Sequence, residues 1–309
     1  DRLPPPQHGP VTPAFSRRAL LAGTASLGLS AFSCGASVER PPLPAKVVAG
    51  YWPTWVPDAI RVRDLPAEYN VVHLFAATPR GTSGDVAWQP PGDGRGARTN
   101  LRTDIAFARK SQGRAVLLSV GGAGHGITFD SRATSTRFVD GLRRIIDTEL
   151  GGVDGVDLNT FEDKHRPNLD EYSWISEGLK SAYGEAFAVC APPAPWRDTD
   201  RAFCRDMAGA GLLDLCGPQY YDDPGLTSTQ YIVDSVGEWA GLVGATRLYV
   251  GFGIISGPPL YMTVERCADA WCRVQQAVPG VRGAFCWNTA ADDAGGWRFA
   301  SEVGRLVLT

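Results

Sequence analysis

The sequence predicts an α/β protein, a (β/α)8 TIM barrel, and three observations lead to that fold class. From residue 47 onward, short apolar runs rich in β-branched residues alternate with amphipathic stretches, as in βα units around a parallel sheet. Eight such runs occupy about 260 residues, which is the usual length of a β/α barrel. The first run lacks a following Gly-x-Gly-x-x-Gly, which a doubly wound dinucleotide-binding fold would carry.

Each predicted strand is a short apolar run, and each predicted helix has apolar residues spaced by three or four. The strands are expected, in chain order, at residues 47–52, 71–76, 115–120, around 156, 186–191, 213–221, 248–252 and 283–287. Helical spacing is clear in Phe138, Leu142, Ile145 and Ile146, in Trp174, Ile175, Leu179 and Tyr183, and in Cys267, Trp271 and Val274. Residues 46–309 are therefore expected to form a single barrel domain.

The fourth strand carries the most informative polar residues of the chain. Because side chains alternate along a strand, Asp157, Asn159 and Phe161 share one face, which we expect to line the barrel interior. Glu162 falls on the opposite face, beneath the surrounding helices. It could enter the barrel only if the strand ends or bulges before Phe161.

This segment resembles the signature D-G-x-D-x-D-x-E of glycoside hydrolase family 18, the chitinases and endo-β-N-acetylglucosaminidases. Asp154, Gly155, Asp157 and Asn159 align with its first four fixed positions, and Phe161 aligns with its proton-donating glutamate. Asn159 replaces an aspartate of the family. The resemblance implies that Asp157 holds residue 159, that Asp154 is the more buried, structural carboxylate, and that the acetamido group of the substrate attacks the anomeric carbon.

Other predicted strand ends are also similar to that family. Ser119, Gly121 and Gly122 match its S-x-G-G, residues 191–193 resemble A-A-P, residues 219–224 resemble Q-F-Y-N-N-P, and Trp287 stands at its eighth-strand tryptophan. The resemblance implies that Tyr221 hydrogen-bonds the N-acetyl carbonyl and that Trp287 lies beneath the sugar. Taken singly, Trp287 could be a core residue and Tyr221 an ordinary surface aromatic.

The carboxyl ends of barrel strands meet at one rim, where barrel active sites are built. Aromatic rings on that rim suit carbohydrate, because pyranose rings present apolar C–H patches. The predicted substrate-binding residues are Trp52, Gln219, Tyr221 and Trp287, and Trp55 could extend the groove. Phe161 and the Ser119 to Gly122 turn are expected to shape the site without reacting.

Three functional hypotheses follow from the altered motif. General acid catalysis contributes about 10²–10⁴-fold, and a phenyl ring at position 161 supplies none of it. The first hypothesis is therefore a barrel that binds N-acetylglucosamine-containing glycans with weak or no hydrolase activity. The second is an active glycosidase, with Asp157, Asn159 and Tyr221 at the site and Glu162 or Asp163 as the acid. The third is a pseudoenzyme that binds a protein partner.

Residues 1–45 are predicted to be an export signal followed by a Pro-rich tether. Arg17 and Arg18 resemble a twin-arginine motif, and an apolar stretch of small residues follows them. Cys34 resembles the lipidated cysteine of a bacterial lipobox, and cleavage near Ala36 is the alternative. The predicted location is extracellular or attached to the cell envelope, with membrane contact only through a lipid on Cys34. A buried N-terminal helix is the structural alternative.

Bulk composition narrows the possible partners. The net charge of −3 gives no basic field for nucleic acid, and no apolar run is long enough to span a bilayer. No metal site is predicted, and no cofactor is expected. Six cysteines beyond Cys34 are an even number, which in an exported chain predicts disulfides; buried free thiols are the alternative. These cysteines are Cys190, Cys204, Cys216, Cys267, Cys272 and Cys286.

Overall fold

The structure is a computed structural model that describes residues 43–160 and 167–309. These residues belong to the second of two units into which the chain divides, Asp1–Glu39 and Arg40–Thr309. The twin-arginine motif and Cys34 lie outside the described residues, as do Phe161, Glu162 and Asp163. Export and lipid attachment therefore stay predictions.

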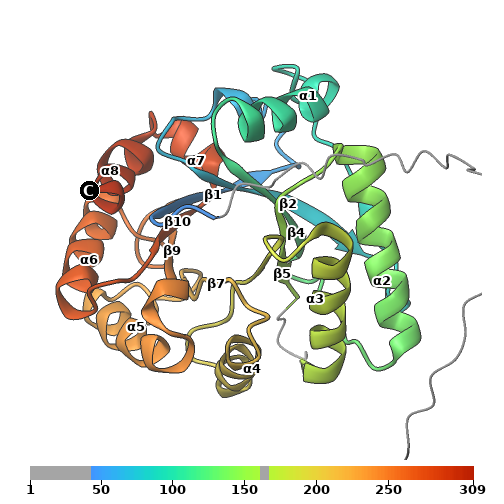
Figure 1. The fold of residues 1–309 in the computed structure, drawn as a ribbon. Coiled ribbons are helices and arrows are strands. Elements are labelled where there is room, and N and C mark those ends of the chain that lie inside the picture. The colour runs from blue at the N-terminus through green and yellow to red at the C-terminus, as the bar shows by residue number, and fades with distance from the viewer. Residues whose placement is uncertain (1–42, 161–166) are drawn as a thin grey trace, which may run out of the picture. The chain divides into compact units, whose positions relative to one another are not determined.

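A closed parallel sheet forms the centre of the fold, and the predicted TIM barrel is confirmed (Figure 1). Its parallel strands are β1 (Val47–Pro53), β2 (Val71–Pro79), β4 (Ala115–Gly121), β5 (Gly155–Asn159), β6 (Ala188–Ala191), β7 (Leu215–Cys216), β8 (Gln219–Tyr220), β9 (Tyr249–Gly253) and β10 (Gly283–Trp287). Neighbours run in the order β7, β6, β5, β4, β2, β1, β10, β9 and β8. Each predicted strand is therefore found, with small differences at the ends.

The sixth predicted strand is divided, and its two halves close the barrel. The first half, β7, pairs with β6, whereas the second half, β8, pairs with β9. Cys216 also bridges to Leu248, immediately before β9. An additional strand, β3 (Val86–Trp88), was not predicted; it pairs antiparallel with the end of β2.

Helices surround the sheet, as Figure 1 shows. They are α1 (Ala97–Lys110), α2 (Arg132–Arg144), α3 (Leu169–Tyr183), α4 (Asp198–Gly209), α5 (Thr229–Val243), α6 (Val264–Ala277), α7 (Thr289–Ala294) and α8 (Arg305–Leu308). Short 3-10 or π segments occur at Val62–Asp64, Ile145–Leu150, Ala245–Arg247 and Phe299–Gly304. Several helices begin at a side chain that accepts a backbone N–H, among them Ser131, Asn168 and Thr263. Within the described residues, no helix is long and apolar enough to cross a membrane.

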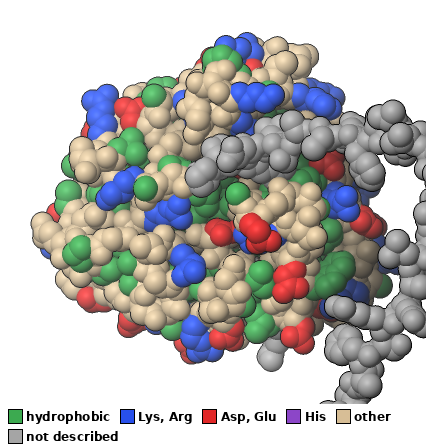
Figure 2. Space-filling view, viewed as in Figure 1, with side chains coloured by type: hydrophobic (Ala, Val, Ile, Leu, Met, Phe, Trp, Pro, Cys, Tyr) green, Lys and Arg blue, Asp and Glu red, His purple; other side chains and the backbone are tan. Residues whose placement is uncertain are grey.

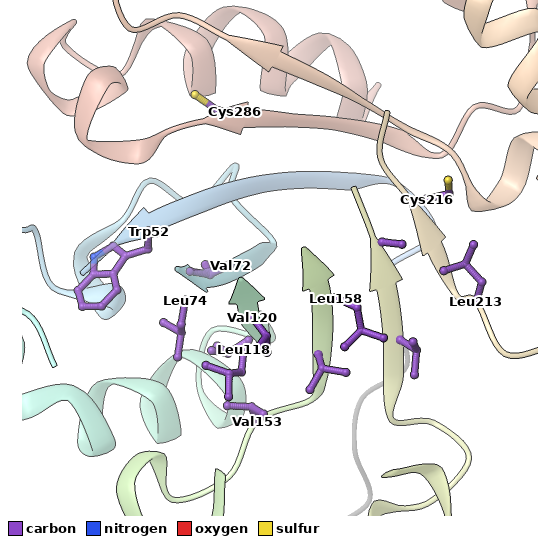
Figure 3. Close-up of a cluster of buried hydrophobic side chains, with 14 of the residues drawn as sticks. Trp52, Val72, Leu74, Leu118, Val120, Val153, Leu158, Leu213, Cys216 and Cys286 are labelled. Atoms are coloured by element: carbon purple, nitrogen blue, oxygen red, sulfur yellow. The ribbon is translucent and has the colours of Figure 1, made fainter. Parts of the chain in front are cut away.

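Strand residues alternate between two apolar layers, as the pleat requires. In β1, Val47, Ala49 and Tyr51 pack inside the barrel, whereas Val48 and Trp52 pack between the strands and the helices. Figure 3 shows side chains of this outer layer, which project from neighbouring strands on the helix side. Both layers are buried, so each strand has a definite inward and outward face.

The amino-terminal end of the barrel is closed by residues just before β1. Leu43 packs against the inner layer. The Arg282 guanidinium donates to the carbonyl oxygens of Pro44 and Leu43, each at 2.9 Å. The barrel unit therefore includes contacts from residues that we had assigned to the tether.

The predicted disulfides are wrong for the part of the chain that the structure describes. All six cysteines there are free, and only Cys272 is exposed. The sheet separates Cys190, in the inner layer, from the cysteines of the outer layer, which are Cys204, Cys216, Cys267 and Cys286. Burial raises the pKa of the Cys190 thiol well above its usual value. These cysteines act as small apolar core residues, as the alternative interpretation expected.

The surface facing the viewer in Figure 2 has acidic and basic side chains interspersed among other residues. This mixture agrees with the small net charge of the chain. It gives no single-sign field on that face that would attract a polyelectrolyte.

Replacing Gly283 by alanine should test the seam between β1 and β10. A Cβ at this position would lie 1.8 Å from the Val47 carbonyl oxygen, which is backbone and cannot move aside. We expect Gly283→Ala to lower the free energy of unfolding by about 3 kcal/mol. The control is Gly241→Ala, at an exposed helical site with open space, where a gain of about 0.5–1 kcal/mol is expected. Urea unfolding of both variants measures the difference, and equal stabilities would contradict the seam.

Candidate functional site

Asp157 lies at the centre of the barrel interior and is fully buried. Its Oδ2 accepts hydrogen bonds from the Tyr51 hydroxyl at 3.0 Å and from the Ser119 hydroxyl at 2.6 Å. Asn159 follows on the same face, at the mouth of the barrel, and is 8% exposed. The predicted inward face of this strand is thus found for Asp157 and Asn159.

Strand β5 ends at Asn159, just before the position that aligns with the family's proton-donating glutamate. Asn159 is the last residue of β5, and the hydroxyl of the following Thr160 bonds to Tyr172 of α3 on the outer side. Within the described residues, β5 therefore ends two residues before Phe161. Phe161 and Glu162 themselves lie outside the described residues.

The electrostatic environment of Asp157 is unusual for a carboxylate. Burial raises its pKa from an ordinary 3.8 to about 7, and the hydrogen bonds from Ser119 and Tyr51 only partly oppose that rise. His73, on β2, lies nearby, with its Nδ1 3.9 Å from Asp157 Oδ2. Burial lowers the pKa of His73 to about 3, so the imidazole is neutral near pH 7 and does not form an ion pair.

Asp154 has a structural role, at the other end of the same strand. Its carboxylate accepts from the Arg109 guanidinium at 2.9 Å and from the Val116 backbone N–H at 2.9 Å. These bonds tie α1 and β4 to the start of β5. The expectation that Asp154 is the more buried carboxylate is wrong, since Asp154 is 2% exposed and Asp157 is 0% exposed.

Gly121 and Gly122 hold the end of β4 against the end of β5. The Gly122 N–H donates to the Asn159 carbonyl oxygen at 2.7 Å. A Cβ on Gly121 would lie 2.2 Å from the same carbonyl oxygen, and both glycines have positive φ. A Cβ on Gly122 would strike the Phe75 ring at 2.4 Å. The glycine pair therefore allows the close approach that positions Asn159 at the mouth.

Tyr221 and Gln219 lie together on the opposite part of the mouth. The Tyr221 hydroxyl donates to Gln219 Oε1 at 2.6 Å, and Gln219 Nε2 donates to the Pro192 carbonyl oxygen at 2.5 Å. The Trp287 ring is nearly parallel to Tyr221, with centroids 6.2 Å apart and planes 5° apart. Trp287 also packs edge-on against Phe75 at 4.8 Å.

A cavity of about 840 Å³ opens at this end of the barrel. It brings together Asn159, Gly121, Gly122, Gln219, Tyr221 and Trp287 from the sequence prediction. Three further aromatic side chains line the cavity: Phe75 from β2, and Trp55 and Trp196 from loops. Trp55 is 54% exposed and Trp196 is 57% exposed, so both rings are available to a ligand.

The prediction that Trp52 contacts substrate is wrong. Trp52 is fully buried on the helix side of β1, and its indole N–H donates to the Ile60 carbonyl oxygen at 2.7 Å. Figure 3 shows it in the outer layer. Its neighbour Tyr51 takes the inward position, and Trp55, beyond the strand, reaches the cavity. Alternation along β1 could have identified this face, because Val47, Ala49 and Tyr51 share one parity and Trp52 has the other.

Two aromatic residues of the cavity were missed. Phe75 lies on β2 at an inward position that alternation along the strand could have identified. Trp196 follows β6 in a loop, where sequence periodicity gives no signal. In residues 43–160 and 167–309, no group of three or more His, Cys, Asp or Glu is placed to hold a metal ion. The absence of a metal or cofactor stays a prediction.

Replacing Asp157 by asparagine should remove one pH-dependent component of stability. Between about pH 4 and pH 7 the folded protein holds a proton on Asp157 that the unfolded chain lacks. The free energy of unfolding of the parent therefore falls as pH rises through that window, because the buried carboxyl must lose its proton. An asparagine at position 157 does not titrate, so it contributes no such fall. The unfolding free energy of Asp157→Asn, relative to the parent, should rise between pH 4 and pH 8 by up to about 4 kcal/mol.

Denaturant titrations at several pH values measure this difference, and the amide's own packing cost adds only a constant offset. Asp154→Asn is the control, because Asp154 is paired with Arg109. It should be destabilising by about 3 kcal/mol at every pH in this range. A difference for Asp157→Asn that stays constant with pH would contradict the buried-carboxyl interpretation.

Sequence comparison finds chitinases among proteins of known function. Chitinase Chi52 of Paenibacillus xylanexedens is 28% identical over 185 residues, a match that covers 55% of this chain. The matched part is 34% of Chi52, so the chain spans about a third of the length of that relative. No family model matches the chain.

Structure comparison finds the same barrel in proteins of different activity. A family GH18 chitinase from Chromobacterium violaceum has a TM-score of 0.73 at 20% identity, covering 87% of this chain and 85% of that one. The xylanase and alpha-amylase inhibitor protein XAIP-II of Scadoxus multiflorus has a TM-score of 0.68 at 17% identity, covering 84% and 98%. The chain therefore has the fold of glycoside hydrolase family 18 chitinases, and its sequence similarity to a chitinase supports a distant relationship to that family.

Proposed function

We propose that this protein binds N-acetylglucosamine-containing glycans in the cavity at the carboxyl end of its barrel, with weak or no hydrolase activity. The observation that carries this proposal is the aromatic wall of the cavity above a polar floor. Trp55, Trp196 and Trp287 offer apolar rings, while Asn159 and Tyr221 offer hydrogen-bonding groups. This combination suits a sugar, which has both apolar faces and polar edges.

Each polar group has a distinct part in the proposed recognition. The Tyr221 hydroxyl, now bonded to Gln219, is placed to turn toward an acetamido oxygen. The Asn159 side chain offers both a donor and an acceptor to the acetamido group. Asp157 lies two residues earlier on the same face, buried beneath the mouth, and supports the residue at position 159.

Weak hydrolysis follows from the chemistry of the motif. Phe161 supplies no proton, and Asn159 cannot carry the charge that an aspartate would place near a positive intermediate. Among described residues that line the cavity, the carboxylates are Asp222 and Asp223. The Tyr261 hydroxyl donates to Asp222, and the Gly225 N–H donates to Asp223 at 2.7 Å, so internal hydrogen bonds already hold both groups.

An active glycosidase is the second candidate, and one observation favours it. The hypothesis requires β5 to end before Phe161, and the strand does end at Asn159. Glu162 or Asp163 would then act as the acid. A protein-binding role is a further possibility, because the same fold occurs in an inhibitor of xylanase and alpha-amylase.

Loss of the Trp287 ring should weaken glycan binding. In Trp287→Ala the affinity for a tetramer of N-acetylglucosamine should fall at least about 10-fold, because the ring's stacking surface is removed. Titration calorimetry on the full chain measures it. The matched control is Trp174→Ala, since Trp174 lies on α3 beneath the Arg132 guanidinium and away from the cavity. Equal affinities for both variants would contradict the proposed sugar site.

Restoring the motif should create or raise turnover. Phe161→Glu combined with Asn159→Asp should increase hydrolysis of a chromogenic oligomer at least about 100-fold over the parent. The control combines Phe161→Gln with Asn159→Asp, which keeps the shape of the new side chain without its acid. A folded but inert double variant would count against the inherited geometry. Parent turnover that disappears in Glu162→Gln or Asp163→Asn would support the second candidate instead.

A further inference from the structure

His73 is a buried imidazole that the proposed function does not explain. It lies inside the barrel on β2 with no exposed surface, and its ring stacks on Tyr51 with centroids 4.4 Å apart. Its Nε2 is 3.4 Å from the Tyr249 hydroxyl. Its Nδ1 has no hydrogen-bond partner among the described residues and lies 3.9 Å from Asp157 Oδ2.

The Asp157 carboxyl is also incompletely satisfied. Oδ2 accepts from Tyr51 and Ser119, but Oδ1 has no partner in the part of the chain that the structure describes. Buried polar atoms are normally hydrogen-bonded, because an unpaired one costs about 1–3 kcal/mol. Of these two unpaired atoms, His73 Nδ1 lies beside Oδ2, the carboxylate oxygen that already accepts from Tyr51 and Ser119.

We propose that His73 is a positioning residue for Asp157, with its imidazole proton on Nδ1 and directed at the carboxylate, so that it sets the pH at which this carboxyl, buried beneath the mouth of the cavity, becomes negatively charged. The 3.9 Å separation is longer than a hydrogen bond. A movement of about 1 Å would close it when the carboxylate ionises.

The tautomer follows from the two neighbours of the ring. A bare Nδ1 lone pair would face the Asp157 oxygen and repel it, whereas an Nδ1–H is attracted to it. The Tyr249 hydroxyl then donates to Nε2, which fixes the proton on Nδ1. In this arrangement Tyr249 donates to His73 and His73 donates to Asp157, so the three residues form a chain of hydrogen-bond donors that ends at the carboxylate.

The other titratable groups that face Asp157 carry no charge that would control its ionisation near neutral pH. Tyr51 of β1, Tyr221 after β8 and Tyr249 of β9 all have pKa values raised well above the ordinary value, mainly by burial. Burial also raises the pKa of the Cys190 thiol on β6. All four therefore stay neutral near pH 7. Within the described residues, no lysine or arginine forms an ion pair with Asp157, so its charge near neutrality depends on neutral donors.

The proposal is tested on the full chain by ¹³C NMR of labelled aspartate carboxyls, with the Asp157 signal identified by its loss in Asp157→Asn. We expect the parent midpoint to be raised above the ordinary value, because burial raises the pKa of Asp157. His73→Phe keeps the stacking ring but has no donor, and should raise the midpoint by about one pH unit. His73→Asn carries an amide near the Nδ1 position and should restore most of the shift. His73→Gln carries its amide near the Nε2 position and should resemble His73→Phe.

Several results would overturn the proposal. A midpoint in His73→Phe that is unchanged or lowered would show that His73 gives the carboxylate no stabilisation. Asn and Phe variants that shift equally would assign the effect to packing alone. If His73→Phe does not fold, the ¹⁵N spectrum of labelled histidine in the parent decides: a proton on Nδ1 is expected, and a proton on Nε2 would contradict the proposal. Because these measurements need no ligand, they are independent of glycan binding.

Discussion

The pleat of the barrel strands is the constraint on which the rest of this structure depends. Each strand is buried on both faces, so alternate residues belong to two separate layers. In β5 this rule places Asp157 and Asn159 inside, while Val156 and Leu158 pack beneath the helices. Alternation along β5 therefore places the Asp157 carboxyl in the buried interior of the barrel and the Asn159 amide at its mouth.

Burial without a cation gives the interior its chemical character. Asp154 and Asp157 are three residues apart and both buried, yet Arg109 forms an ion pair only with the first. Asp157 depends on hydroxyl donors from β1 and β4, which do not fully offset its desolvation. Asp154 points toward α1, where its ion pair with Arg109 gives it a structural role. Asp157 points into the barrel, where hydroxyl groups donate to it.

Much of the fold could be predicted because apolar runs and their spacing report directly on buried strands and helices. The divided sixth strand and the short β3 could not, since their pairings depend on distant neighbours rather than on local pattern. The disulfide prediction failed because cysteine number does not say how a thiol is used: Cys204 and Cys216 interact within the outer layer and are still free thiols. The sheet lies between Cys190 and the outer-layer cysteines, which fill core positions like any small apolar residue.

At the candidate site, motif residues were easier to predict than the aromatic wall. Asn159, Gly122, Tyr221 and Trp287 meet at one cavity because they end parallel strands on one rim. Trp52 was misassigned because an aromatic residue near the end of a strand need not be on its inner face, and Trp52 packs in the outer layer. Trp196 comes from a loop, whose conformation depends on packing that periodicity does not encode.

The central claim, a sugar-binding barrel that has lost its acid, is tested most directly by a crystal structure of the full chain soaked with an N-acetylglucosamine tetramer. The account predicts an intact oligosaccharide over Trp287, with its acetamido group at Tyr221 and Asn159. An empty cavity, or a cleaved oligosaccharide with the Glu162 carboxyl at the scissile oxygen, would contradict it.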